Sequence, residues 1–362
     1  KNFPSENNFF PTERVSKVSK RTIREIIYCS LLKIHEEKNI PLITLNNFPK
    51  NNKTIFNFRI DTDFAKRNEI TNLYSLCKKH GINATWLVET KSSKKWIHIY
   101  KNMKNQEIGF HCHRHKVFNS FKKNNINLAK GISVLKKIGF KDLGFASPFG
   151  IWNNEISKSI NKFNFQYSSE FGLDYDNLPF FPYTKKKAFS NVLQIPIHPI
   201  CVGSLKNSRH SFNEMKKYFH NLISDHSLNN LPIFVYDHPK QYDEKILTWL
   251  FNKINELDLS SLTLFDYSKW WIKKSKIKWK AKIQNNKIIL DFKDWDDSVF
   301  LKLSRKDMKP IIINKNKNIN LTNFKWEPED KILSFKNIEK LNQLNRKIII
   351  NNCLQFYWKS KL

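Results

Sequence analysis

The sequence lacks the cysteine patterns that cross-link small secreted domains through disulfides or that bind structural zinc. Its five cysteines are an odd number and are scattered along the chain, and no two of them form a C-x-x-C pair. This excludes a zinc ribbon and gives no support to a disulfide framework. Reduced thiols in a cytoplasmic setting are the simplest interpretation.

Apolar runs long enough to span a bilayer are also missing. The chain begins at Lys1 rather than at a methionine, so we expect it to be a fragment of a longer protein. The absence of a signal peptide then says little, and an envelope-associated location stays open beside the cytoplasmic one.

Arginine is scarce beside lysine, although the formal net charge reaches +31. The lysines are spread over the whole chain and form no Arg-rich stripe or aromatic-interleaved motif, which argues against specific nucleic-acid binding. Weak attraction to anionic glycans or to an anionic membrane surface is the more modest interpretation of this excess. The oligomeric state is not indicated.

Strand-like and helix-like stretches alternate from residue 53 to about 275. Roughly seven such units predict an α/β fold, a distorted (β/α)7-type barrel of parallel strands with its site at their carboxyl ends. The strands are expected at 54–60, 83–89, 107–111, 142–147, 165–169, 192–198, 232–236 and 262–265. The helices are expected at 69–80, 127–138, 154–163, 212–227 and 244–257.

The two ends of the chain differ from this alternation. Residues 1–52 read as an arm and a helix at about 22–35, with apolar residues at helical spacing, and we expect both to pack on the main domain. The alternative is that this helix is the end of a missing upstream domain. Short alternating runs in 276–362 predict a small all-β C-terminal domain. Its aromatic residues are expected to pack in a core or to contact sugar rings.

Two acidic residues follow the first predicted strand. Asp61 and Asp63 are two apart, so an extended backbone turns both carboxylates to one side. Capping of the next helix would explain one of these aspartates but not both.

Three histidines lie within five residues after the third predicted strand: His111, His113 and His115. Imidazole is the commonest metal-binding side chain, and a helical turn from His111 would bring His115 to the same side. The alternative is a solvated polar turn. One aspartate and a histidine pair suit a metal site, with the second carboxylate left as a base.

Four segments, in order along the chain, resemble the motifs of the polysaccharide deacetylase family. They are 58–63, 107–115, 144–150 and 234–239, and the resemblance extends over about 56–274. Members of this family are metal-dependent de-N-acetylases with a distorted parallel barrel. The resemblance therefore implies a carbohydrate substrate and a divalent metal, with Zn²⁺ expected.

The resemblance also implies a role for each matching residue. Asp63, His111 and His115 would bind the metal, and Asp61 would be the catalytic base. A metal-bound water would act as the nucleophile, since the ion lowers its pKa. His238 would protonate the leaving sugar amine.

The sequence departs from the family pattern at three places. Thr62 stands between the two acids, and Ala146 stands where the family has the arginine that positions the base. Arg59 and Arg114 are the two alternatives for that missing arginine. The fourth motif, expected near 168–176, lacks its tryptophan.

Two further histidines have undecided roles. His113 either contacts the metal ligands or the substrate, or it simply faces solvent. His198 also follows a predicted strand and is expected near the cleft.

The predicted function is a metal-dependent hydrolase that removes N-acetyl groups from a cell-envelope or capsular polysaccharide. Two alternatives stay open. One is hydrolysis of another non-peptide amide on the same scaffold. The other, motivated by Ala146, is a descendant that binds glycan without turning it over.

Overall fold

The computed structural model describes residues 20–170, 176–183, 190–316 and 318–329. Its centre is a four-stranded parallel sheet in the order β4-β3-β2-β7. The strands are β2 (Phe56–Asp61), β3 (Thr85–Glu89), β4 (Glu107–Cys112) and β7 (Ile233–Asp237). Every residue of these strands is buried, as expected for a parallel sheet covered on both faces.

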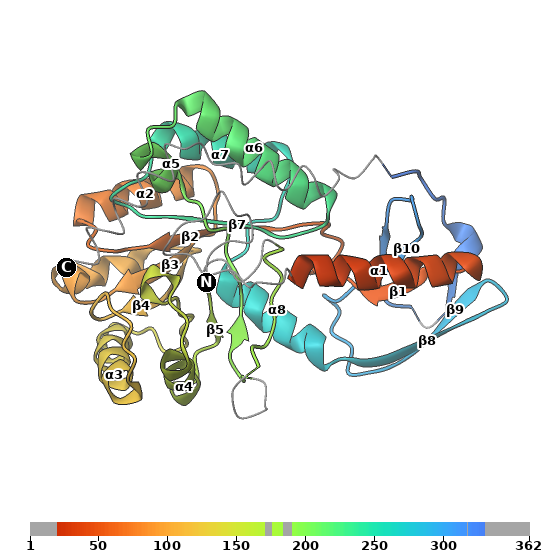
Figure 1. The fold of residues 1–362 in the computed structure, drawn as a ribbon, viewed down its shortest axis with the longest axis horizontal. Coiled ribbons are helices and arrows are strands. Elements are labelled where there is room, and N and C mark those ends of the chain that lie inside the picture. The colour runs from red at the N-terminus through yellow and green to blue at the C-terminus, as the bar shows by residue number, and fades with distance from the viewer. Residues whose placement is uncertain (1–19, 171–175, 184–189, 317, 330–362) are drawn as a thin grey trace.

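Helices lie on both sides of this sheet, with α2, α6 and α7 above it and α3 and α4 below it in Figure 1. Several begin at a Ser, Thr, Asn or Asp whose side chain accepts a backbone N–H bond. The helices are α2 (Arg67–Lys79), α3 (Phe121–Lys137), α4 (Asn154–Lys162), α5 (Val202–Asn207), α6 (Phe212–Leu228), α7 (Glu244–Glu256) and α8 (Leu264–Lys276). Short 3₁₀ turns are η1 (Ser92–Lys95), η2 (Ile97–Asn102), η3 (Pro148–Gly150) and η4 (Leu321–Asn323).

Backbone hydrogen bonds continue beyond both edges of the sheet. Phe110 N donates to Gly144 O at 2.8 Å, and Phe145 N donates to Tyr167 O at 3.0 Å. Tyr167 lies in β5 (Tyr167–Ser168), which pairs in parallel with β6 (Leu193–Gln194). On the other side, His198 N donates to Phe234 O of β7 at 2.9 Å. The mixed α/β architecture is as predicted, while closure into a barrel stays a prediction.

The C-terminal strands form two antiparallel sheets, in the orders β1-β10-β11 and β12-β9-β8. Their bounds are β8 (Lys278–Gln284), β9 (Lys287–Lys293), β10 (Leu301–Ser304), β11 (Ile311–Ile313) and β12 (Asn318–Asn320). The strand β1 (Leu42–Leu45) comes from the predicted N-terminal arm and pairs with β10. The predicted domain bounds stay predictions, and the part of the predicted all-β domain beyond residue 329 lies outside the described residues.

Several predicted strands are shorter than expected, and those at 165–169 and 192–198 are reduced to the two-residue strands β5 and β6. In 262–265, Leu262 N donates to Phe56 O at 3.0 Å, but Thr263 then caps α8 by accepting from Asp266 N. The helix therefore begins at Leu264, and a strand through 265 is wrong. In 142–147, only Phe145 forms a bridge to its neighbours. The helix α5 was not predicted.

The N-terminal helix α1 (Lys20–Glu37) forms where a helix was predicted, but with the opposite face inward. Arg21 is 4% exposed, whereas Ile26 and Ile27 are 62% and 55% exposed. The helix contacts α6 through Arg21 and Asp225, while these two isoleucines face outward. No helix among the described residues is long and apolar enough to cross a membrane.

Candidate metal centre and active site

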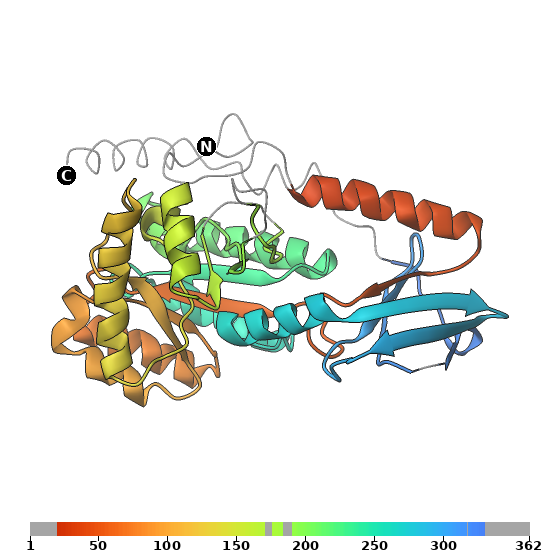
Figure 2. The same ribbon diagram turned by 90° about the horizontal axis from the view of Figure 1, so that it is seen from below.

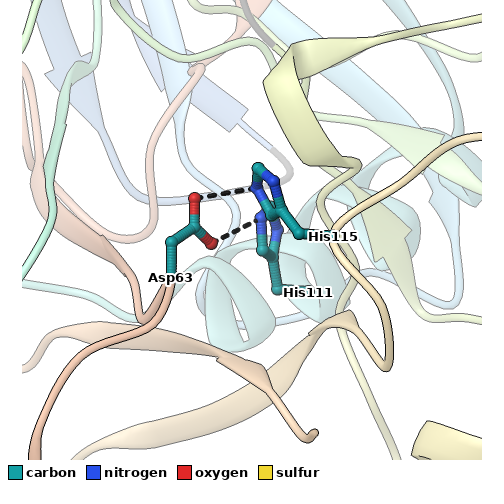
Figure 3. Close-up of side chains that lie close together, drawn as sticks. All are labelled: Asp63, His111 and His115. Atoms are coloured by element: carbon teal, nitrogen blue, oxygen red, sulfur yellow. Dashed lines mark ion pairs between the residues drawn. The ribbon is translucent and has the colours of Figure 1, made fainter. Parts of the chain in front are cut away.

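Asp63, His111 and His115 meet at the carboxyl ends of β2 and β4. His111 Nε2 lies 2.9 Å from Asp63 Oδ1, and His115 Nε2 lies 2.8 Å from Asp63 Oδ2. Figure 3 shows both imidazole rings turned toward the one carboxylate. These three predicted ligands therefore form a group compact enough to hold a metal ion.

The orientation of His111 is fixed by the backbone. His111 Nδ1 lies 2.8 Å from the carbonyl oxygen of Ala146. A carbonyl can only accept, so Nδ1 carries the hydrogen. In the neutral ring, Nε2 then presents a lone pair to Asp63. A backbone carbonyl is a common partner for a metal-binding histidine, because it selects the ring nitrogen left for the ion.

The donor atoms fit a cation. Asp63 Oδ1, His111 Nε2 and His115 Nε2 are buried and have no hydrogen-bond partner, although they lie close together. An imidazole lone pair and a carboxylate oxygen at such distances repel each other unless a proton or a metal ion lies between them. Nitrogen and oxygen donors in a set of three match the protein ligands of catalytic zinc sites.

The electrostatics without a metal show how strongly the carboxylate attracts positive charge. Burial opposes a charge on His111, but Asp63 outweighs burial and raises the pKa of His111 to about 9. Burial likewise opposes the charge of Asp63, yet the two imidazoles hold its pKa well below its usual range. Below pH 9 a proton thus occupies the position that a cation would take.

Two phenylalanines enclose His115. The ring of Phe149 lies edge-on with centroids 4.4 Å apart, and the ring of Phe64 lies at 5.6 Å. Both phenylalanines have left-handed backbone, with φ values of 57° and 51°. Such strain in bulky residues costs of order 1 kcal/mol or more and is concentrated at functional sites.

The predicted base, Asp61, is held by an arginine. Arg59 Nη2 donates to Asp61 Oδ2 at 2.6 Å, while Nη1 donates to Ser169 O at 2.6 Å and to Ser169 Oγ at 3.1 Å. The guanidinium also lies 5.3 Å from the ring centroid of Tyr236. Arg114 is exposed, so Arg59 is the alternative that reaches the acid.

His238 follows β7 and faces Asp63. Its Nε2 lies 3.7 Å from Asp63 Oδ2. Burial lowers the pKa of His238, against the opposing charges of Asp63 and Asp61. The lowered pKa disfavours the charged imidazole, which must gain a proton before it can act as an acid.

Asp237 is a buried group beside the site that the sequence analysis missed. Its Oδ1 accepts from Gly203 N at 3.2 Å and from His238 N at 2.9 Å. Burial raises the pKa of Asp237 to about 7. Together with Cys201 and His238 it forms a second compact group of potential ligand atoms. Its place before His238 at a strand end was the available signal.

The two undecided histidines lie elsewhere. His113 Nδ1 contacts Thr90 Oγ1 at 3.1 Å. His198 is buried, and its Nε2 contacts Tyr218 Oη at 2.6 Å. The interaction of His198 with Tyr218 gives no support to a place in the cleft. Residues 171–175 of the expected fourth motif lie outside the described residues.

No family model matches the chain. No curated protein matches it either. Among solved structures, a "putative polysaccharide deacetylase from Mycobacterium smegmatis" matches with a TM-score of 0.50 and 12% identity, over 65% of this chain and 96% of that one. A CE4 family pseudoenzyme from Bacillus anthracis matches with a TM-score of 0.43 and 16% identity, over 60% of this chain and 66% of that one. At such identities the likeness concerns the fold alone, and the chain shares its α/β fold with the polysaccharide deacetylase from Mycobacterium smegmatis.

Proposed function

We propose that the chain is a metal-dependent hydrolase that removes N-acetyl groups from a sugar of a cell-envelope or capsular polysaccharide. The observation that carries this proposal is the convergence of the three unpartnered donor atoms of Asp63, His111 and His115. A carboxylate held by Arg59 and the imidazole of His238 lie beside them. Zn²⁺ is the proposed ion, and a (β/α)7-type barrel closed through residues 144–145 and 198 is the proposed scaffold.

Each residue has a role in the proposed reaction. Asp63, His111 and His115 hold the ion, which when bound lowers the pKa of water and polarises the acetyl carbonyl. Asp61 accepts the proton of the attacking water through Oδ1, the carboxylate oxygen that has no hydrogen-bond partner. His238, once protonated, donates to the leaving sugar amine. Each such proton transfer contributes typically about 10²–10⁴-fold to the rate.

Replacing one ligand tests the proposal. In His111→Ala we expect loss of bound zinc and a fall in acetate release of at least about 100-fold, because the remaining two ligands no longer match a catalytic zinc site. The measurements are metal content by mass spectrometry and acetate release from a panel of N-acetylated glycans, with and without a chelator.

His113→Ala is the matched control, because His113 lies two residues away and contacts Thr90 instead of Asp63. It should keep both metal and activity. Full acetate release by metal-free His111→Ala would refute the proposal. Release of formate or ammonia instead of acetate from the panel would favour another amide substrate. Glycan binding without product from the zinc-loaded protein would favour the binding-only alternative.

A further inference from the structure

The helix α1 turns its polar side to the protein and its apolar side outward, the reverse of an ordinary surface helix. Polar contacts hold its inner face. Arg21 Nη1 donates to the buried Asp225 Oδ2 at 2.9 Å, and Tyr28 Oη donates to Ser304 Oγ at 2.6 Å. Near its start, Arg24 Nη1 lies 2.5 Å from the buried Asp176 Oδ2. These contacts fix the helix on both the α/β part and β10.

The outer face of α1 is a continuous apolar stripe. Its members recur three and four residues apart, so they lie along one side of the helix. Their exposed fractions are 46% for Ile23, 62% for Ile26, 55% for Ile27, 40% for Leu31 and 49% for Ile34. Leaving five such side chains in water is unfavourable, and a contiguous exposed patch of this kind marks an interaction surface. Figure 2 shows α1 along one edge of the molecule, above the C-terminal strands.

The surroundings of the stripe are basic. Lys33 and Lys38 are exposed on and just after the helix; of the two exposed glutamates between them, Glu36 lies 3.4 Å from Lys306 Nζ and Glu37 is the last helical residue. Lys302 of β10 lies 4.9 Å from the ring centroid of Tyr28, and Arg305 Nη1 lies 3.4 Å from Asn39 Oδ1. Glu25, the acid nearest the middle of the helix, is paired with Arg21 at 2.7 Å. The stripe therefore has lysines and arginines at its margins.

We propose that this stripe is a membrane-docking surface, on which α1 lies flat at an anionic lipid bilayer. The isoleucines and the leucine enter the boundary between headgroups and acyl chains, while the marginal lysines bind lipid phosphates. Charge decides between a bilayer and a second copy of the chain as the occupant. Two molecules that each carry +31 repel each other, whereas the same charge attracts an anionic surface.

The test is cosedimentation of the full chain with vesicles. Wild type should bind phosphatidylglycerol vesicles, bind phosphatidylcholine vesicles much more weakly, and lose binding as salt rises. In Ile26→Glu/Ile27→Glu, binding to the anionic vesicles should fall by about tenfold or more, because two apolar side chains that enter the bilayer become charged. Ile26→Ser/Ile27→Ser, which adds no charge, should weaken binding in the same direction.

Ile126→Glu/Phe212→Glu is the matched control, since these residues are 48% and 41% exposed on α3 and at the start of α6, the end opposite to the Asp225 that contacts α1. It should lose only the modest affinity that two added acids cost. Melting temperatures of all variants check folding. Equal losses in the control and in the α1 variants, or no wild-type binding to anionic vesicles, would overturn the proposal. A wild-type dimer in light scattering that the α1 variants convert to monomer would assign the stripe to a second copy instead.

Discussion

At the level of single residues, Arg59 is the arginine that contacts Asp61, since position 146 is an alanine. Arg59 lies two residues before Asp61 on the same strand, so both side chains point to the same side. The guanidinium and the carboxylate are 1% and 2% exposed, and the ion pair is therefore shielded from water. Ser169 accepts the other arm of the guanidinium and fixes its direction. The arginine that contacts the carboxylate of Asp61 thus comes from β2, whereas position 146 has no side chain that could do so.

Replacing Arg59 should separate base positioning from metal binding. In Arg59→Ala we expect kcat to fall by about 10²-fold, with zinc content preserved, because Asp61 loses its orientation while the three ligands remain. Unfolding should also become easier by about 3–5 kcal/mol, because a buried carboxylate is left unpaired. In Arg59→Lys, both kcat and the free energy of unfolding should lie between those of wild type and Arg59→Ala. The reason is that an ammonium group keeps the charge but cannot contact Asp61 and Ser169 at once as a guanidinium does.

Steady-state kinetics, metal content and thermal melts measure these effects on one preparation. An unchanged kcat in a zinc-loaded Arg59→Ala would contradict the positioning role. A variant that loses zinc together with activity would mean that Arg59 supports the ligands themselves.

The spacing of residues was sufficient to predict that Asp63, His111 and His115 lie close together. Strand ends of a parallel sheet lie at one edge, so acids after β2 and histidines after β4 had to come close. Spacing did not decide between Arg59 and Arg114, because exposure depends on the tertiary packing of both. Asp237 was missed because a carboxylate next to a histidine has no distinctive pattern until its burial is known.

At the scale of elements, Glu107 joins four of them. It begins β4 and is buried, and its Oε1 accepts from Tyr167 Oη of β5 at 2.6 Å. Its Oε2 accepts from Thr85 Oγ1 of β3 at 2.8 Å and from Phe265 N of α8 at 2.9 Å. Burial outweighs these hydrogen bonds and raises the pKa of Glu107 to about 7.

This shift predicts a dependence of stability on pH. The folded chain binds the proton of Glu107 more tightly than the unfolded chain, whose glutamate has a pKa near 4.5. The stability contributed by this group therefore falls as pH rises from 4.5 to 7 and stays lower above 7. In Glu107→Gln that part of the fall should disappear. Urea unfolding of wild type and Glu107→Gln at pH 5 and pH 8 measures this loss of stability. An equal loss in both proteins would contradict its assignment to Glu107.

Elements with many backbone partners were predictable, and those with few were not. The buried strands β2, β3, β4 and β7 were predicted because their apolar runs match a covered parallel sheet. The 142–147 segment is also apolar, but it forms bridges only at Phe145, one to Phe110 and one to Ser168. The outward direction of the apolar face of α1 was not predicted, because periodicity locates such a face without showing whether the protein or another surface covers it.

At the scale of the whole molecule, one hydrophobic cluster joins the α/β part to the C-terminal strands. Tyr167, Leu193 and Trp270 belong to the same buried cluster as Leu290 and Leu301. The strand β1 adds backbone pairing between the N-terminal part and β10. The two parts therefore depend on each other for burial of their side chains.

Deletion of residues 277–362 should lower the melting temperature of the remainder or make it insoluble. The physical reason is that the deletion leaves the partners of this cluster in water, at a cost of roughly 25 cal/mol per Å² of apolar surface. Thermal melts and light scattering of the truncated chain measure this. A truncated chain as stable and soluble as the full one would mean that the C-terminal strands are an independent unit.

Ala146 is the position at which this chain differs most clearly from the family pattern, yet it still contributes to the site through its carbonyl oxygen. Every residue type carries that same oxygen, so the contact with His111 survives changes of side chain as long as the backbone path is kept. A comparison of residue types at each position of a sequence cannot detect such a main-chain contribution. A judgement of activity from the alanine side chain alone would therefore overlook the contact of this carbonyl with His111.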